Sequence, residues 1–240
     1  MVQIIRAHRR KVLRLSASIA RARIRFRDRV AFNTTEPQHE RMRVALFGGS
    51  FDPPHVGHQL ASLYVLETFP VDELWLVPVF RHAFDKRLTP YQHRLAMCDR
   101  LAQSLGTRAR VSSVEEELGG PSYTLHMVRR LQHKHPDIEF SLVIGSDLIK
   151  ERERWFGWHE LSSRLPFLVL HRGGSDSSAR PDPPACDIFH HEQLILPEVS
   201  STAVRAALSQ GNCPTGWISR SVLSYIEDHS LYLAKEEERS

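Results

Sequence analysis

Two histidines spaced three residues apart, His55 and His58, lie in the stretch GGSFDPPHVGH, which follows a short apolar run. Side chains at this spacing lie on one face of a helix, and in the first turn they lie beside backbone N–H groups that have no acceptor within the helix. Imidazoles and N–H groups in such a place bind phosphate oxygens. The stretch therefore predicts a phosphate site in which both histidines take part.

Glycines and a helix-entry signal surround the two histidines. Gly48 and Gly49 have no side chains, so backbone N–H groups there can approach an anion closely, and Gly57 leaves room for a nucleotide against the backbone. Asp52 is predicted to cap the helix, because Asp is a favoured N-cap residue and the two prolines after it are tolerated at first helical positions.

Other interpretations of the histidines remain open. Either one alone fits a packed or solvated side chain. The pair also fits zinc, although neither an HExxH nor a CxxC string accompanies it and a third ligand would have to come from elsewhere in the chain.

A second polar stretch, SSTAVR, begins with Ser200, Ser201 and Thr202 and ends with Arg205. Hydroxyls and N–H groups at the start of a helix bind phosphate oxygens, and an arginine one turn along adds a permanent charge with forked donors. The alternative is an ordinary helix N-cap, which uses the same residue types. Beside the histidines, we interpret the stretch as a second phosphate-binding segment.

Alternating apolar runs and helical patterns predict the elements that position these stretches. Strands are expected at 43–48, 73–79, 109–114, 138–145, 167–171 and 193–199. Helices are expected at 59–68, 91–105, 123–133 and 147–155, with closing helices at 200–211 and 220–233 and a loop at 172–187. This order favours an α/β fold with a doubly wound parallel sheet and C-terminal helices, in which ligands bind beyond the carboxyl ends of the strands.

The composition indicates one main domain. A chain of 240 residues, 41% of them hydrophobic, can bury one substantial core. It has no apolar run long enough to span a membrane. Its three cysteines form no CxxC pair, which favours reduced thiols, so we expect a cytoplasmic protein and assign the cysteines no role.

Positive charge is concentrated in the first 41 residues. They hold ten arginines and one lysine against three acidic residues, a net charge of +8, whereas the whole chain carries +4, so residues 42–240 carry −4. We therefore expect 42–240 to be the folded domain, without a nucleic-acid groove, and 1–41 to be a basic extension that is disordered or outside the fold. That extension fits an RNA-binding arm, a targeting segment, or upstream sequence before a start at Met42.

Both polar stretches resemble signatures of one protein superfamily. GGSFDPPHVGH resembles the HxGH signature of the nucleotidyltransferase superfamily of adenylyl- and cytidylyltransferases, and VSSTAVR, at 199–205, resembles its ISSTxxR motif. PSYTL at 121–125, IGSD at 144–147 with Trp155, and YIEDHSLY at 225–232 are similar to strings of the nicotinate-nucleotide adenylyltransferase family. The resemblance covers 42–240, and residues 1–41 match nothing recognised.

This resemblance implies a Rossmann-like nucleotidyltransferase fold that transfers AMP from ATP to nicotinate mononucleotide, giving deamido-NAD and pyrophosphate. His55 and His58 would be catalytic. The implied contacts to ATP and its phosphates come from Gly48, Gly49, Ser50, Phe51, Gly57, Lys86, Ser201, Thr202 and Arg205. Gly145 and Asp147 would contact the ribose or nucleotide, and Tyr123, Thr124 and Trp155 would enclose the pyridine ring. Mg²⁺ would be carried by the phosphates, with no metal held by the protein itself.

Several alternatives remain beside this implied activity. The segment around Lys86 lacks the prolines of the corresponding family segment, so Lys86 also fits a solvated loop residue. Nicotinamide mononucleotide, alone or together with the acid, is the nearest other acceptor. Pantetheine-phosphate adenylyltransferase shares both signatures but usually has Thr at the position of His55. A nucleotide-sensing or RNA-associated module would keep the fold without catalysis, and homo-oligomerisation stays open.

Overall fold

The computed structural model describes residues 41–81, 87–149, 154–170, 188–190, 197, 199–212 and 215–233. For Asp147, Ile149 and residues 188–190 it describes the backbone alone. The chain divides into two units, Met1–Glu40 and Arg41–Ser240, and the description below concerns the second. Residues 1–40 lie outside the described part, so the boundary that we expect at Met42 stays a prediction.

In the described part of the chain, six parallel strands form one sheet in the order β3-β2-β1-β4-β5-β6. The strands are β1 (Met42–Gly49), β2 (Glu73–Pro78), β3 (Ala109–Val111), β4 (Ile138–Gly145), β5 (Phe167–Leu170) and β6 (Ile188–His190). The chain extends the sheet from β1 toward β3 and then returns to place β4 on the other side of β1. The doubly wound parallel sheet is therefore confirmed, with its reversal of strand order between β1 and β4, where such sheets bind ligands.

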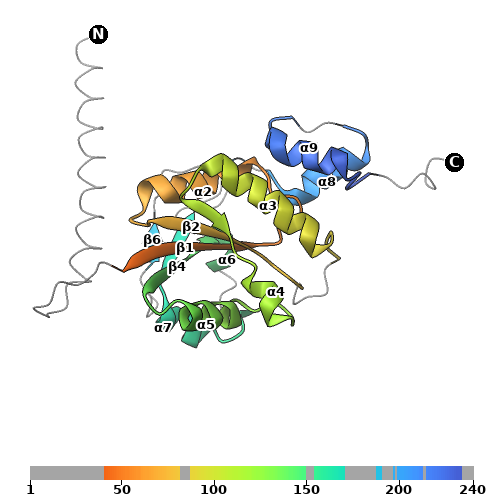
Figure 1. The fold of residues 1–240 in the computed structure, drawn as a ribbon. Helices are drawn as coiled ribbons and strands as arrows, with labels where there is room; N and C mark the ends of the chain where they lie inside the picture. The colour runs from red at the N-terminus through yellow and green to blue at the C-terminus, as the bar shows by residue number, and fades with distance from the viewer. Residues whose placement is uncertain are drawn as a thin grey trace, which may run out of the picture. The chain divides into compact units, whose positions relative to one another are not determined.

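Helices cover both faces of the sheet (Figure 1). They are α2 (Val56–Thr68), α3 (Tyr91–Leu105), α4 (Val114–Leu118), α5 (Thr124–Lys134), α6 (Ser146–Ile149), α7 (Trp158–Arg164), α8 (Ser201–Ser209) and α9 (Arg220–Asp228). α2 and α3 pack on one face, and α4, α5 and α7 pack on the other. Among the described helices, none combines the length and the apolar character needed to cross a bilayer.

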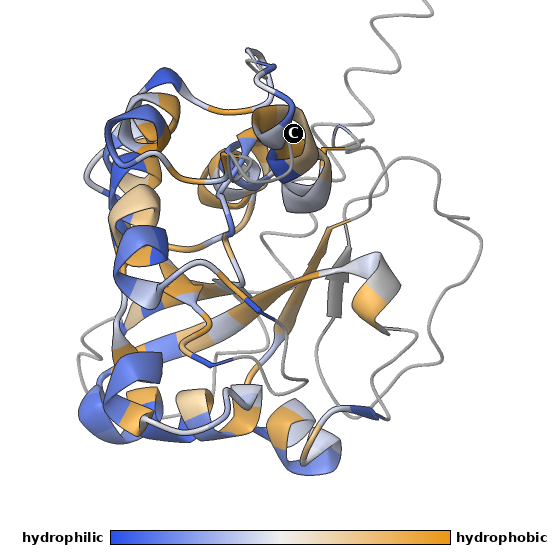
Figure 2. Ribbon diagram, turned by 90° about the vertical axis from the view of Figure 1, so that its right-hand side faces the viewer, coloured by the Kyte–Doolittle hydropathy of each residue, from blue (hydrophilic) through white to orange (hydrophobic). Residues whose placement is uncertain are grey.

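Alternating residues of each central strand supply two separate core layers. In β1, Val44 and Leu46 pack toward α5 and α7, whereas Ala45 packs toward α2 and α3. A strand buried on both faces needs apolar residues at every position, which explains the continuous apolar runs in the sequence. Figure 2 shows the same arrangement, with hydrophobic residues along the strands and hydrophilic ones mostly on the outer sides of the helices.

A third apolar cluster attaches the C-terminal helices to α3. Met97 of α3 packs against buried residues of α8, α9 and the segment between them: Val204, Leu208, Ile218, Val222, Tyr225 and Ile226. α8 begins after its N-cap, Ser200, whose side chain accepts a hydrogen bond from the N–H of Ala203 (3.1 Å). The second polar stretch therefore starts a helix, as predicted.

Most element boundaries agree with the sequence, and the exceptions have local causes. α2 begins at Val56, three residues before the predicted start at residue 59, and its N-cap is His55 instead of the predicted Asp52. The strand predicted at 109–114 ends at Val111, since buried Val114 already begins α4. α9 ends at Asp228, and the chain then turns through Ser230 and Tyr232, both with positive φ.

Two further predictions differ in the region around and after β4. In place of one helix at 147–155, the structure has α6 and, further along, the unpredicted α7, while 150–153 lie outside the described residues. β6 lies upstream of the strand predicted at 193–199. Of that segment, only residues 197 and 199 are described, neither in a strand, and the predicted loop at 172–187 lies wholly outside the described part.

Candidate active site

The junction between β1 and α2 brings the two histidines together. His55 is the N-cap of α2 and His58 is the third helical residue, so their imidazole rings lie with centroids 3.8 Å apart and planes tilted by 33°. The backbone N–H of His55 donates to Nδ1 of His58 (3.1 Å). Because Nδ1 accepts this bond, neutral His58 carries its proton on Nε2. His58 is therefore held in the tautomer that can donate a hydrogen bond through Nε2.

The glycines of the junction have different neighbours. A Cβ at Gly57 would lie 3.0 Å from ring atoms of His55, and one at Gly49 would lie 3.2 Å from the Phe51 ring. Neither contact leaves comfortable room for a side chain. A Cβ at Gly48 would meet nothing within 4 Å. Gly48 and Gly49 belong to β1 itself, so Gly48 lines open space at the strand end while Gly57 and Gly49 accommodate neighbouring rings.

Phe51 forms the base under the histidines. Its ring is buried, lies 4.9 Å from the His58 ring and makes an edge contact of 5.7 Å with Phe47. Its φ is +47°, a left-handed conformation that few non-glycine residues adopt. The Phe51 ring is thus a packing group of the loop, and the ATP contact that the resemblance implies for Phe51 stays a prediction.

Arg94, a residue that the sequence analysis missed, donates hydrogen bonds to the loop between β1 and α2 and to the segment after β2. Its side chain is only 1% exposed. It donates four hydrogen bonds to backbone carbonyls: Ser50 (2.9 Å), Val79 (2.7 Å), Phe80 (3.3 Å) and Thr89 (2.8 Å). Burial lowers the pKa of its guanidinium below the ordinary value. The available signal was a charged residue within the apolar stripe of α3.

The start of α8 contacts the same loop. Ser201 Oγ donates to the carbonyl oxygen of Pro53 (2.9 Å), and Arg205 Nη1 donates to that of Asp52 (2.7 Å). Arg205 Nη2 also donates to Thr202 Oγ1 (3.2 Å), and Thr202 is exposed. The two polar stretches, about 150 residues apart in the chain, therefore meet at the carboxyl end of β1.

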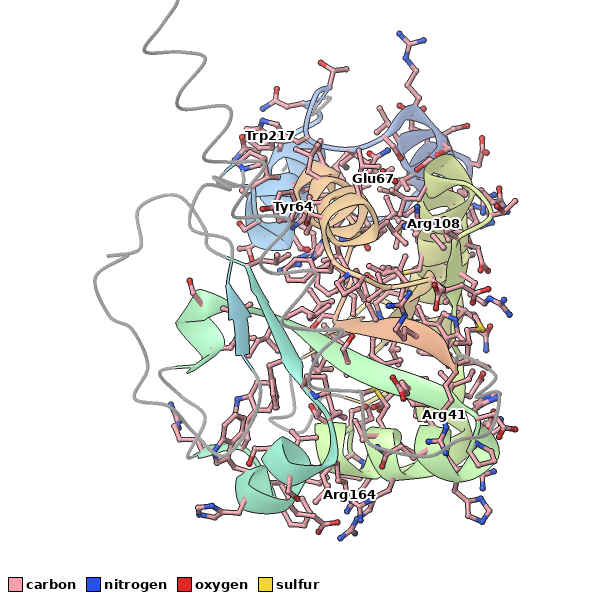
Figure 3. The ribbon with its side chains drawn as sticks, turned by 90° about the vertical axis from the view of Figure 1, so that its left-hand side faces the viewer. Arg41, Tyr64, Glu67, Arg108, Arg164 and Trp217 are labelled. Carbon is pink, nitrogen blue, oxygen red and sulfur yellow. The ribbon has the colours of Figure 1, made fainter. Side chains whose placement is uncertain are left out.

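The C-terminal segment holds both ends of the loop. The N–H of Val56, the first residue of α2, donates to the carbonyl oxygen of Trp217 (2.7 Å). Figure 3 shows Trp217 beside α2, on which Tyr64 and Glu67 are labelled. At the other end, the Asp52 carboxylate accepts a hydrogen bond from the hydroxyl of Tyr232 (2.7 Å). The cap predicted for Asp52 is wrong, because its carboxylate faces the protein interior instead of the N-terminus of α2.

A group of aromatic rings lies at the start of α5. Tyr123 is the N-cap of α5, and its ring lies 4.9 Å from that of Phe156. Phe156 is 54% exposed and also contacts His126 (5.2 Å). Trp155 instead packs against the core and against Trp158 (6.2 Å). Thr124 is the first residue of α5. The sequence analysis missed Phe156, whose only signal was its position next to Trp155.

The remaining candidates are placed only in part. Gly145 ends β4, adjacent to β1 at the reversal of strand order, and pairs with Leu170. Asp147 lies in α6, directly after that strand end, with its backbone alone described. Lys86 lies outside the described residues. Within the described part of the chain, no group of three or more His, Cys, Asp or Glu side chains is arranged to hold a metal ion.

Comparisons with known proteins show which proteins this chain is similar to. The cytidylyltransferase-like family model matches residues 46–207. Proteins of Myxococcus xanthus and Salinibacter ruber, each named "Probable nicotinate-nucleotide adenylyltransferase", are both 37% identical to this chain over 80% of its length, covering 95% and 98% of their own. A solved structure of Plasmodium falciparum nicotinic acid mononucleotide adenylyltransferase complexed with NaAD has a TM-score of 0.69 at 23% identity, covering 80% of this chain and 97% of that one. The last comparison shows a shared fold.

Proposed function

This chain belongs to the cytidylyltransferase-like family and, within it, to the nicotinate-nucleotide adenylyltransferases, and from this premise we propose that it transfers AMP from ATP to nicotinate mononucleotide. The products are deamido-NAD and pyrophosphate. The observation that carries the proposal is the meeting of the paired histidines with Ser201 and Arg205 at the reversal of strand order. Imidazole, hydroxyl, guanidinium and helix N–H donors converge there, and all of them bind phosphate oxygens.

The reaction needs alignment and neutralisation of charge. An oxygen of the 5′-phosphate of nicotinate mononucleotide attacks the α-phosphorus of ATP, and the bond from that phosphorus to the oxygen bridging to the β-phosphate breaks. The attacking oxygen is already anionic, so the step requires neither a general base nor a covalent enzyme intermediate. Fixed donors around the α-phosphate and the leaving pyrophosphate therefore supply the catalysis.

The site residues divide between these two charges. His58, with its proton on Nε2, is assigned to a non-bridging oxygen of the α-phosphate, and buried His55 holds that ring through their contact. Arg205 and the N-terminus of α8 are assigned to the pyrophosphate, because a guanidinium keeps its charge throughout the reaction. Mg²⁺ bound by the phosphates of ATP would neutralise part of the charge on the leaving group.

The acceptor side is assigned to the rings at the start of α5. Tyr123 and Phe156 offer apolar ring faces to a pyridine ring. The first N–H groups of α5, beginning with Thr124, have no acceptor within the helix, so they can donate to a carboxylate. A carboxylate accepts hydrogen bonds only, whereas an amide also presents two donors that would face these N–H groups. The geometry therefore favours nicotinate mononucleotide over its amide.

Pyrophosphate release by the full chain with Mg²⁺-ATP and a set of acceptors tests this proposal. We expect the specificity constant for nicotinate mononucleotide to exceed that for nicotinamide mononucleotide at least about tenfold, since each mismatched buried polar group costs about 1–3 kcal/mol. Equal constants would make the enzyme dual in specificity. Preference for 4′-phosphopantetheine would move the chain to the other acceptor class. ATP binding without turnover of any acceptor would indicate a nucleotide sensor.

A further inference from the structure

Asp52 connects the two phosphate-binding segments through both its side chain and its main chain. Its carboxylate is buried and accepts two hydrogen bonds, from the N–H of Thr89 to Oδ2 (3.2 Å) and from the hydroxyl of Tyr232 to Oδ1 (2.7 Å). Its carbonyl oxygen accepts the hydrogen bond from Arg205 (2.7 Å). Hydrogen bonds that hold the Asp52 carboxylate therefore also hold the Asp52 carbonyl group, which orients Arg205.

Tyr232 reaches this carboxylate from the end of the described chain, 180 residues further along. Its side chain packs against the C-terminal apolar cluster, and its hydroxyl oxygen also takes a hydrogen bond from the side chain of Thr89. Burial, and then the negative charge of Asp52, raise the pKa of the Tyr232 hydroxyl well above its ordinary value. Tyr232 therefore keeps its proton at neutral pH and serves as a donor to Asp52.

Backbone conformation on both sides of this hydrogen bond is unusual. Phe51, the residue before Asp52, has φ +47°, and Tyr232 has φ +63°. Non-glycine residues keep such conformations only where surrounding contacts over-determine them, and they concentrate at functional sites. The two strained residues flank the Asp52 carboxylate, which indicates that the shape of this loop is imposed by its contacts.

We propose that Tyr232 is a positioning residue for AMP transfer, acting through Asp52. Its hydroxyl holds the carboxylate so that the Asp52 carbonyl keeps Arg205 directed at the phosphates. The same loop leads into His55, so the hydrogen bond from Tyr232 to Asp52 also positions the histidine pair relative to Arg205. This inference rests on the proposed function, since AMP transfer is the reaction for which the groups are aligned.

The test compares two tyrosines of the C-terminal region. Tyr232→Phe removes only the hydroxyl that binds Asp52. Tyr225→Phe is a matched control, because its hydroxyl is also in a partly buried hydrogen bond, to Nδ1 of His93 (3.0 Å), but has no contact with the loop. We expect Tyr232→Phe to lower kcat about tenfold or more with KM for nicotinate mononucleotide unchanged, because small misplacements of aligned groups slow the step strongly. Tyr225→Phe should keep kcat within about twofold, and both thermal midpoints should fall by similar amounts.

A double-mutant comparison then separates positioning from general weakening of the fold. If Tyr232 acts through Asp52, adding Tyr232→Phe to Asp52→Asn should lower kcat much less than Tyr232→Phe does alone. Equal kcat in Tyr232→Phe and Tyr225→Phe, or losses that multiply in the double variant, would overturn the inference. If Tyr232→Phe fails to fold while the control folds, Asp52→Asn is measured instead. A lower kcat with unchanged KM for nicotinate mononucleotide supports the inference, and an unchanged kcat overturns it. A wild-type chain without adenylyltransfer would overturn the proposed function, and the inference with it.

Discussion

The two halves of the site are built in different ways. At the junction of β1 and α2, charged side chains donate to backbone carbonyls: buried Arg94 to four of them, and half-buried Arg205 to that of Asp52. At the start of α5, the candidate acceptor residues Tyr123 and Phe156 contact each other through their rings, and half of Phe156 remains exposed. One half is fixed by polar contacts, and the other is a partly exposed aromatic surface.

This difference follows from what each half is proposed to bind. Charge that develops on phosphate oxygens is stabilised only by donors already in place, because reorganising them during the reaction would forfeit the gain. A buried polar network supplies such donors, since each of its members is held by several others. A flat aromatic ring is bound mainly by area and ring contact, which tolerates small shifts. We therefore expect substitutions in the first half to affect folding and turnover, and those in the second to affect acceptor affinity.

The largest effect is expected on stability, from Arg94→Met. The substitution keeps the apolar length of the side chain but leaves four carbonyl groups without their donor and removes one of the positive charges near Asp52. Breaking such a buried charged network costs about 3–5 kcal/mol. Urea denaturation should show this loss in the free energy of unfolding. Arg129→Met is the control, since exposed Arg129 pairs with Glu160 on the surface and should change the free energy of unfolding far less than Arg94→Met does.

The next effect is expected on turnover, from His58→Ala. Loss of one donor to the transition state lowers kcat about a hundredfold to a thousandfold. The thermal midpoint should change little by comparison, because the His58 ring is only partly buried. His159→Ala, at an exposed position of α7, controls for the removal of an imidazole. If His58→Ala keeps nearly full kcat, His58 is a packing residue, and the junction of β1 and α2 does not supply this donor to the reaction.

Local patterns in the sequence predicted the parts of the fold and site that depend on neighbouring residues. α3 has the predicted bounds, Tyr91–Leu105, and the strands in the centre of the sheet agree within a residue or two. The spacing of His55 and His58 predicted their proximity, because three residues are one turn of a helix. Glycine and proline in the loop marked it without revealing its shape.

The contacts that hold the loop could not be predicted in the same way. Arg94, Ser201 and Arg205 all donate to backbone carbonyls, and a carbonyl acceptor leaves no trace in the type of the residue that carries it. Asp52 was interpreted as a cap because the residues next to it are typical of one, whereas its partner Tyr232 is 180 residues away. Chain topology decides such pairs, and their residue types alone do not.

A smaller effect, on affinity, should separate the two aromatic residues at the acceptor side. Phe156→Ala is expected to raise KM for nicotinate mononucleotide about tenfold with the thermal midpoint unchanged, because the ring is largely exposed and contacts Tyr123. Trp155→Ala should also raise that KM but lower the thermal midpoint, since Trp155 packs against the core. Unchanged KM in either variant would exclude that residue from the acceptor pocket.

The smallest effect concerns Glu115, which lies between the two halves. Its carboxylate is buried beside Ser122 and the backbone of Phe80, whose N–H donates to Ser122 Oγ (3.1 Å), next to the acceptor rings and to the loop that Arg94 holds. Burial raises the pKa of Glu115 above its ordinary value of 4.5. The Glu115 carboxyl group therefore holds its proton more tightly in the folded protein than in the unfolded chain. That contribution favours folding below pH 4.5 and is lost as the pH rises through the folded-state pKa.

The free energy of unfolding of Glu115→Gln, compared with that of the wild type, should accordingly increase as the pH rises. Glutamine has nearly the same shape but carries no charge that burial disfavours, so at neutral pH the variant should be more stable than the wild type. Urea denaturation from pH 4.5 to pH 7.5 measures the difference. Glu116→Gln, at the exposed neighbouring position, is the control for the substitution itself. If the free energy of unfolding depends on pH in the same way for the wild type and Glu115→Gln, then burial of the Glu115 carboxylate does not destabilise the fold at neutral pH.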